Sequence, residues 1–179
     1  MVLSYSIDAD DRIIGTSDTW DAFAMQNCGA GARTNLVSGH RIWSFVSGDQ
    51  TQSFLNAIFF SVRRTQQPFS TKTRCDSSET KRSCTMYVVP SGGMGLKISF
   101  KMMQTHAVKK LSKRCTLTSR SYRVCSICNA LELDGNWNHE NTTALSSSTG
   151  SNFGVCPSCR KVTRDKINRL SRQSAFAAN

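Results

Sequence analysis

Two short cysteine pairs in the last third of the chain most constrain what it can fold into. They are Cys125-Ser-Ile-Cys128 and Cys156-Pro-Ser-Cys159, and 27 residues separate them. A Cys-x-x-Cys turn directs two sulfurs the same way, and two such turns complete the closed tetrahedral shell of a structural Zn²⁺. The spacing therefore predicts one structural zinc ion bound by Cys125, Cys128, Cys156 and Cys159.

The segment between the pairs supports this interpretation, because it has too few apolar residues to close a core of its own. Two unconnected pairs of reduced thiols are one alternative, and a redox Cys-x-x-Cys is another. A redox motif normally needs one pair and sits at a strand-to-helix junction. A Cys₃His site that uses His139 would leave one cysteine spare, so four cysteines are the simpler ligand set.

The chain has 179 residues, enough for one ordinary domain and a small appendage. It contains no apolar run of 18 residues and no start of the secretory kind, which predicts a cytoplasmic protein without a membrane partner. Reduced cysteines are then expected rather than a disulfide scaffold. Outside the two pairs, we expect small buried or half-buried side chains at Cys28, Cys75, Cys84 and Cys115.

Charge is distributed unevenly along the chain. Residues 1–105 carry 11 Lys/Arg against 8 Asp/Glu, whereas residues 106–179 carry 12 against 4, so the second part holds +8 of the formal +11. We expect a first domain at 1–105, a basic linker at 106–122 and a cysteine module at 123–179 that ends in a basic helix over Arg160–Arg172. The linker is interpreted as a solvated connector, with a nucleic-acid patch as the alternative.

The start of the first domain has the pattern of a β-hairpin. Tyr5–Ile7 and Arg12–Ser17 alternate around an aspartate-rich turn. A helix is expected to follow and to run through Asn27, with Ser17 or Asp18 accepting its first free amide protons.

Two further helical segments are expected. The first is a short turn within Ser38–Val46 whose large side chains point inward. The second is a longer helix over Asp49–Arg64, with Gln52 on the face opposite its apolar residues. The apolar residues at helical spacing are Phe54, Leu55, Ile58, Phe59 and Val62.

Beyond this helix, apolar residues recur at every second position instead of every third or fourth. This alternation indicates half-buried strands over Phe69–Cys75, Arg82–Val89 and Leu96–Met102. Their alternation predicts an exposed face and an inner face. The expected exposed residues are Thr71, Thr73, Thr85, Tyr87 and Lys97, and the expected inner ones are Met86, Val88 and Ile98. The order of elements predicts an α+β fold with a five-stranded antiparallel sheet and helices on one side.

The run from Tyr5 to Gln104, with "IDADDRIIGTSDTWDAFA", "GHRIWSFV", the long helix and three closing strands, resembles a PAS-type sensor domain of the small bacterial kind. The tail, with "CSICNALELDGNW" and "GVCPSC", is similar to a module appended to bacterial PAS-containing and related signalling proteins. It departs from that module at Phe153, where a His is expected, and at Asn129-Ala130, where basic residues are usual. The resemblance implies a PAS-like domain with a Cys₄ zinc-knuckle-like module.

The resemblance also raises the question of a ligand between sheet and helices. Cys28 lacks the Asn-Cys-Arg-Phe-Leu-Gln context of a flavin photosensor. His40 is interpreted as an ordinary surface histidine rather than a haem ligand. Aromatic residues at helical spacing are interpreted as core. The identity of a PAS ligand, or its absence, stays open.

No catalytic motif is found, so a non-enzyme is predicted. The predicted function is intracellular regulation, in which the PAS-like domain senses a ligand or a partner and the zinc module docks signalling proteins. The partner, or a second copy, is expected on the outer face of the sheet or along an edge strand at Tyr5–Ile7. The alternative is a nucleic-acid-binding regulator that grips phosphates with its basic tail, which salt would weaken steeply.

Overall fold

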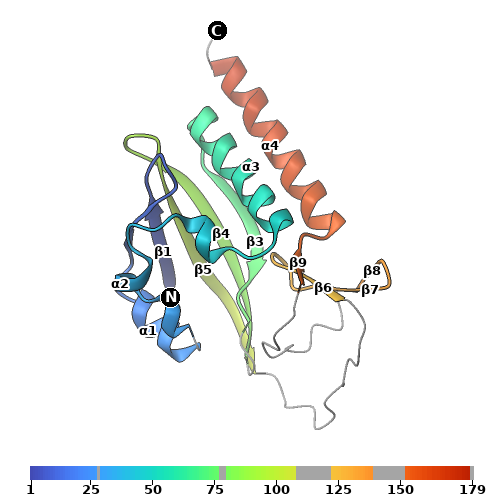
Figure 1. Ribbon diagram of the computed structural model, residues 1–179. Helices are drawn as coiled ribbons and strands as arrows, with labels where there is room; N and C mark the ends of the chain where they lie inside the picture. Colours follow the sequence, from blue (N-terminus) through green and yellow to red (C-terminus); the bar gives the residue numbers. More distant parts are fainter. Residues whose placement is uncertain (28, 77–79, 108–121, 139–151, 178–179) are drawn as a thin grey trace.

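The computed structural model has an α+β architecture in which helices cover one face of an antiparallel sheet (Figure 1). The structure describes residues 1–27, 29–76, 80–107, 122–138 and 152–177. Cys28, Cys115, His139 and nearly all of the predicted basic linker therefore lie outside the described residues.

The main sheet has five strands in the order β2-β1-β5-β4-β3, and every neighbouring pair is antiparallel. The strands are β1 (Val2–Ile7), β2 (Ile13–Thr16), β3 (Phe69–Arg74), β4 (Thr80–Ser91) and β5 (Gly95–Ala107). The fold class and the helices on one side are as predicted. The proposed edge strand is wrong, because β1 pairs with β2 on one side and β5 on the other. The edges of the sheet are β2 and β3.

The segments between β2 and β3 supply most of the helical layer. They are α1 (Trp20–Gln26), η1 (Ala30–Ala32), α2 (Thr34–Val37), η2 (Ile42–Phe45) and α3 (Asp49–Thr65). The long predicted helix is confirmed with one more residue at its end. It begins after Gly48, whose φ of 84° suits glycine, and Gln66, which follows its last residue, adopts the left-handed conformation.

The buried face of α3 packs on the sheet. Ile58, Phe59 and Val62 are fully buried and belong to the same core as Val88 of β4 and Ile98 of β5. This confirms the helix face that the apolar spacing predicts. Each of these side chains is removed from water completely, so the core of the sheet is held by apolar burial.

The opposite face of α3 differs from the prediction at Gln52. Its Nε2 donates hydrogen bonds to the carbonyl oxygens of Trp43 (3.2 Å) and Val46 (2.8 Å), so the side chain fastens η2 instead of facing water. Ile42 of η2 is buried as expected, but Phe45 is 42% exposed and does not point inward. The turn is thus held by the buried Ile42 and by the two hydrogen bonds from Gln52.

The predicted cap of α1 is also wrong. The helix begins after Thr19, and no side chain caps it. Ser17 Oγ instead accepts a hydrogen bond from the amide of Ser4 (3.1 Å), which ties the approach to α1 to strand β1.

Strand β3 presents Thr71 and Thr73 to the helical side, which corrects the predicted exposed face. They are only 6% and 9% exposed, and their cross-strand partners are Met86 and Cys84. Residues opposite each other in a sheet share a face, so both threonines follow Phe69 inward. Their burial comes from segments that arrive much later in the chain.

These later segments form a second, smaller sheet and a long helix. The sheet has the order β8-β7-β6-β9, and β6 is antiparallel to β7 but parallel to β9. The elements are β6 (Tyr122–Cys125), β7 (Leu131–Leu133), β8 (Asn136–Asn138), β9 (Asn152–Gly154) and α4 (Pro157–Ala177). None of these strands is anticipated by the sequence analysis.

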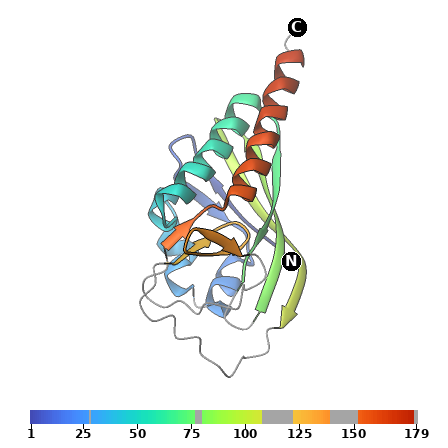
Figure 2. The same ribbon diagram turned by 90° about the vertical axis from the view of Figure 1, so that its right-hand side faces the viewer.

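Helix α4 contains the predicted basic stretch and lies alongside α3, as both views show (Figures 1 and 2). Arg64 Nη2 donates to Ser171 Oγ (2.6 Å), and Ser174 Oγ donates to the carbonyl of Thr65 (3.4 Å). The two helices therefore run in the same direction. Within the described residues, none of the helices combines the length and apolar character needed to cross a membrane.

Candidate metal centre

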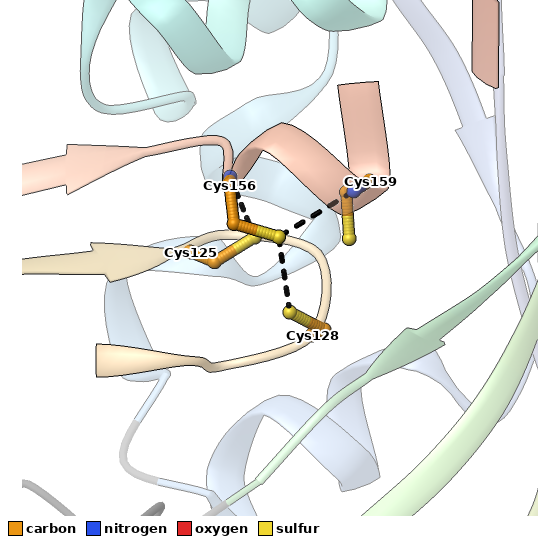
Figure 3. Close-up of side chains that lie close together, drawn as sticks. All are labelled: Cys125, Cys128, Cys156 and Cys159. Atoms are coloured by element: carbon orange, nitrogen blue, oxygen red, sulfur yellow. Dashed lines mark hydrogen bonds between the residues drawn. The ribbon is translucent and has the colours of Figure 1, made fainter. Parts of the chain in front are cut away.

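The four cysteines selected from the sequence come together at the junction of the second sheet and α4 (Figure 3). All four Sγ atoms lie within 4.8 Å of one another, and those of Cys128 and Cys156 are 3.7 Å apart. In a tetrahedron with metal–sulfur bonds of about 2.3 Å, neighbouring sulfurs lie about 3.8 Å apart. The four cysteines are free thiols, and their cluster can hold a metal ion.

The first pair sits in a tight turn at the end of β6. The turn is closed by the amide of Asn129, which donates to the carbonyl of Cys125, and by the amide of Cys125, which donates to the carbonyl of Ala130, both at 2.9 Å. Asn129 has a φ of 60°, a left-handed conformation that asparagine tolerates well. Ala130 is fully buried, which suits a small residue.

The second pair is positioned by the start of α4. Cys156 directly precedes the helix, Pro157 is its first residue and Cys159 lies in its first turn, where proline is favourable because its missing N–H has no helical partner. The amide of Cys159 points at Cys156 Sγ, and the amide of Cys156 points at Cys125 Sγ, each at 3.4 Å. Backbone amides and the positive end of a helix both favour thiolates here.

Proton sharing shows how closely the sulfurs interact. A hydrogen bond from the Cys128 thiol, and then one from Cys159, lower the pKa of Cys125. Their bonds with Cys125 raise the pKa of Cys128 and Cys159 in turn. Thiols that hydrogen-bond one another in this way compete for the same negative charge. A divalent cation stabilises every coordinating thiolate and removes this competition.

The first cysteine turn is fastened to the main sheet and to α3. The carbonyl of Ile127 accepts hydrogen bonds from Thr73 Oγ1 (2.9 Å) and from the amide of Arg74 (2.8 Å) on β3. Ser126 Oγ shares a hydrogen bond of 2.7 Å with Thr51 Oγ1 in the first turn of α3. The turn therefore continues the edge of the main sheet.

The segment before the second pair is fastened as well. Gly48 lies so close to β9 that a Cβ there would come within 2.6 Å of the Phe153 carbonyl oxygen. Gln50 Oε1 accepts a hydrogen bond from the amide of Val155 (3.4 Å). Because Val155 and Cys156 belong to the same buried cluster as α3, the cysteine segment shares the core of the sheet.

The residues that make these attachments are not predicted by the sequence pattern. They are Gly48, Gln50, Thr51, Thr73 and Arg74. A glycine just before a helix is a visible signal, but nothing local marks the others, since their partners lie more than 50 positions away in the chain.

The remaining cysteines and the histidine candidate have ordinary surroundings. Cys75 is half-buried and Cys84 buried, as predicted, and burial raises the pKa of both thiols, that of Cys84 to about 11. His40 is exposed and lies edge-on to Phe45, with ring centres 6.3 Å apart. No protein-family model matches the sequence, and no curated protein matches it significantly.

Proposed function

We propose that Cys125, Cys128, Cys156 and Cys159 bind one structural Zn²⁺, and that the chain is a non-enzymatic regulatory protein built on a PAS-like domain. The proposal rests on the four-sulfur cluster at the start of α4. Four thiolates in a tetrahedron select zinc or an iron–sulfur centre. Four protein ligands leave no open position for substrate, which favours a structural role.

The metal ion would hold α4 in place. Two of its ligands belong to the turn attached to β3, and the other two flank the first residues of α4. A metal–sulfur shell therefore fixes the direction in which α4 leaves the second sheet. Helix α4 then lies along α3 and covers the buried side of β3.

The PAS-like assignment rests on the order of elements. Two strands, several helices and three strands build one antiparallel sheet with helices on one face, which is the pattern behind the resemblance. We propose that the outer face of this sheet contacts a signalling partner. Tyr87 is 39% exposed there, and the exposed Lys101 and Lys72 flank Thr85 on neighbouring strands. A face with these cations suits an acidic partner surface.

Nucleic-acid binding is the second candidate, because α4 carries several exposed cations. The exposed basic residues of this helix are Arg160, Lys161, Arg164, Arg169 and Arg172. Contacts with several phosphates would give an affinity that falls steeply with salt.

Metal analysis of the purified full-length protein, joined to a binding assay, tests both parts. We expect one zinc per chain, no absorbance from iron, and capture of an acidic protein whose affinity falls with salt less steeply than the affinity for nucleic acid would. Well under one metal per chain would overturn the zinc site. Strictly monomeric protein that recovers nucleic acid alone, in a salt-sensitive manner, would favour the second candidate.

A further inference from the structure

A groove of about 500 Å³ lies between the first halves of α3 and α4. Its apolar lining comes from Phe54 and Ala57 of α3 and Ile167 of α4. Arg160 and Arg164 line it from α4. Small-molecule sites in proteins have this size and this combination of an apolar lining with a few polar groups.

Thr163 gives the groove an unused polar group. It lines the groove and is only 4% exposed, yet its hydroxyl makes no hydrogen bond with any residue that the structure describes. Two other hydroxyls of the same helix behave differently: Ser171 and Ser174 donate to the carbonyls of Ile167 and Leu170, both at 3.1 Å. A hydroxyl that no described residue engages can donate a hydrogen bond to a polar group of a ligand in the groove.

The charges on the groove favour an anion. Arg160 and Arg164 are one helical turn apart and exposed, and their side chains pair with no described residue. Asp49 is the one carboxylate among the lining residues, so the groove carries a net positive charge. Guanidinium groups bind carboxylates through two parallel hydrogen bonds.

We propose that this groove binds a small carboxylic acid with an apolar body. The apolar body lies on Phe54, Ala57 and Ile167, the carboxylate pairs with Arg164 and Arg160, and the Thr163 hydroxyl donates to it. This site is separate from the cysteine cluster and from the outer face of the sheet. Because the ligand would contact both helices, its binding would also stabilise the packing of α4 on α3.

Titration of the metal-loaded, full-length protein with octanoate tests the proposal, with octan-1-ol as a neutral probe of the same chain length. We expect octanoate to shift the NMR signals of Ala57, Thr163 and Ile167, with a Kd on the order of 1 mM or below. Octan-1-ol should bind at least about tenfold more weakly, because it lacks the charge. No binding of octanoate, or equal binding of both probes, would overturn the proposal.

Variants locate the site. Arg164→Gln should weaken octanoate binding by roughly tenfold or more, whereas Arg169→Gln, an equal loss of charge on the same helix outside the groove, should leave the Kd unchanged. Ala57→Trp and, independently, Ser53→Trp should block the groove, and both replaced residues are exposed. Equal effects of the two arginine variants, or unchanged binding in a folded tryptophan variant, would place octanoate elsewhere and refute the site.

Discussion

The main sheet and the cysteine lobe, residues 122–138 and 152–177, are stabilised in different ways. In the main sheet, β4 and β5 have 12 and 13 residues and bury apolar side chains beneath α3. In the lobe, β6 has four residues and the other strands have three each. Strands this short are not stable by themselves. The short strands of the lobe therefore rely on contacts with the sheet, and its four cysteines can add the bonds of a metal ion.

The comparison shows that a boundary in the sequence need not be a boundary in the core. Composition and charge divide the chain near residue 105, but Cys125, Ile127 and Val155 lie in the same buried cluster as α3. The predicted division into 1–105, 106–122 and 123–179 remains a prediction. Each experiment below measures how strongly the stability of one region depends on the other.

Loss of the metal should have the largest effect. The free energy of binding a structural zinc is largely folding free energy, on the order of 10 kcal/mol at neutral pH. Cys156→Ser should therefore unfold the lobe, and hydrogen exchange should show faster exchange there. Because Thr73, Arg74 and Thr51 bond to the first cysteine turn, exchange should also rise in β3 and the first turn of α3.

The matched control is Cys84→Ser, which changes a buried cysteine outside the cluster. It should keep the metal and leave the lobe protected. A lobe that stays protected in metal-free Cys156→Ser protein would show that apolar contacts hold it without the sulfurs.

Removing a large side chain from the core of the sheet should have the second-largest effect. Phe59→Ala removes a fully buried ring, and we expect a loss of about 3–5 kcal/mol in the free energy of unfolding. The neighbouring Phe60 is 65% exposed, so Phe60→Ala should stay within about 0.5 kcal/mol. Chemical denaturation of the metal-loaded protein measures both. Equal midpoints for the two variants would mean that α3 does not anchor the core.

The smallest effect should come from the link between the regions. Thr73→Val removes one hydrogen bond to the Ile127 carbonyl, which keeps its bond from the Arg74 amide. The expected loss is about 1 kcal/mol. Thr85→Val makes the same exchange on the outer face of β4 and should be near neutral. If Thr73→Val and Thr85→Val lower the free energy of unfolding by the same amount, the hydrogen bond from Thr73 to Ile127 does not stabilise the contact between the two regions.

The sequence by itself determined the features that repeat locally. The spacing of Ile58, Phe59 and Val62 defines α3 and the face it buries, because a helix returns to the same side every three to four residues. Alternation in the later strands defines the meander. The two Cys-x-x-Cys pairs define the candidate ligands, because only short turns bring two sulfurs together.

Tertiary structure alone decided the features that need a distant partner. Helix α2 begins where the amide and the hydroxyl of Thr34 both donate to Asp21 Oδ1, each at 2.7 Å, and these bonds lower the pKa of Asp21. The sequence pattern predicts that Gln52 and Thr73 are exposed. In the fold, Gln52 bonds to the carbonyls of Trp43 and Val46, and Thr73 bonds to Ile127, which lies 54 positions later in the chain. Local periodicity shows that a face is polar, but only the folded chain supplies the donor or acceptor that allows a polar side chain to be buried.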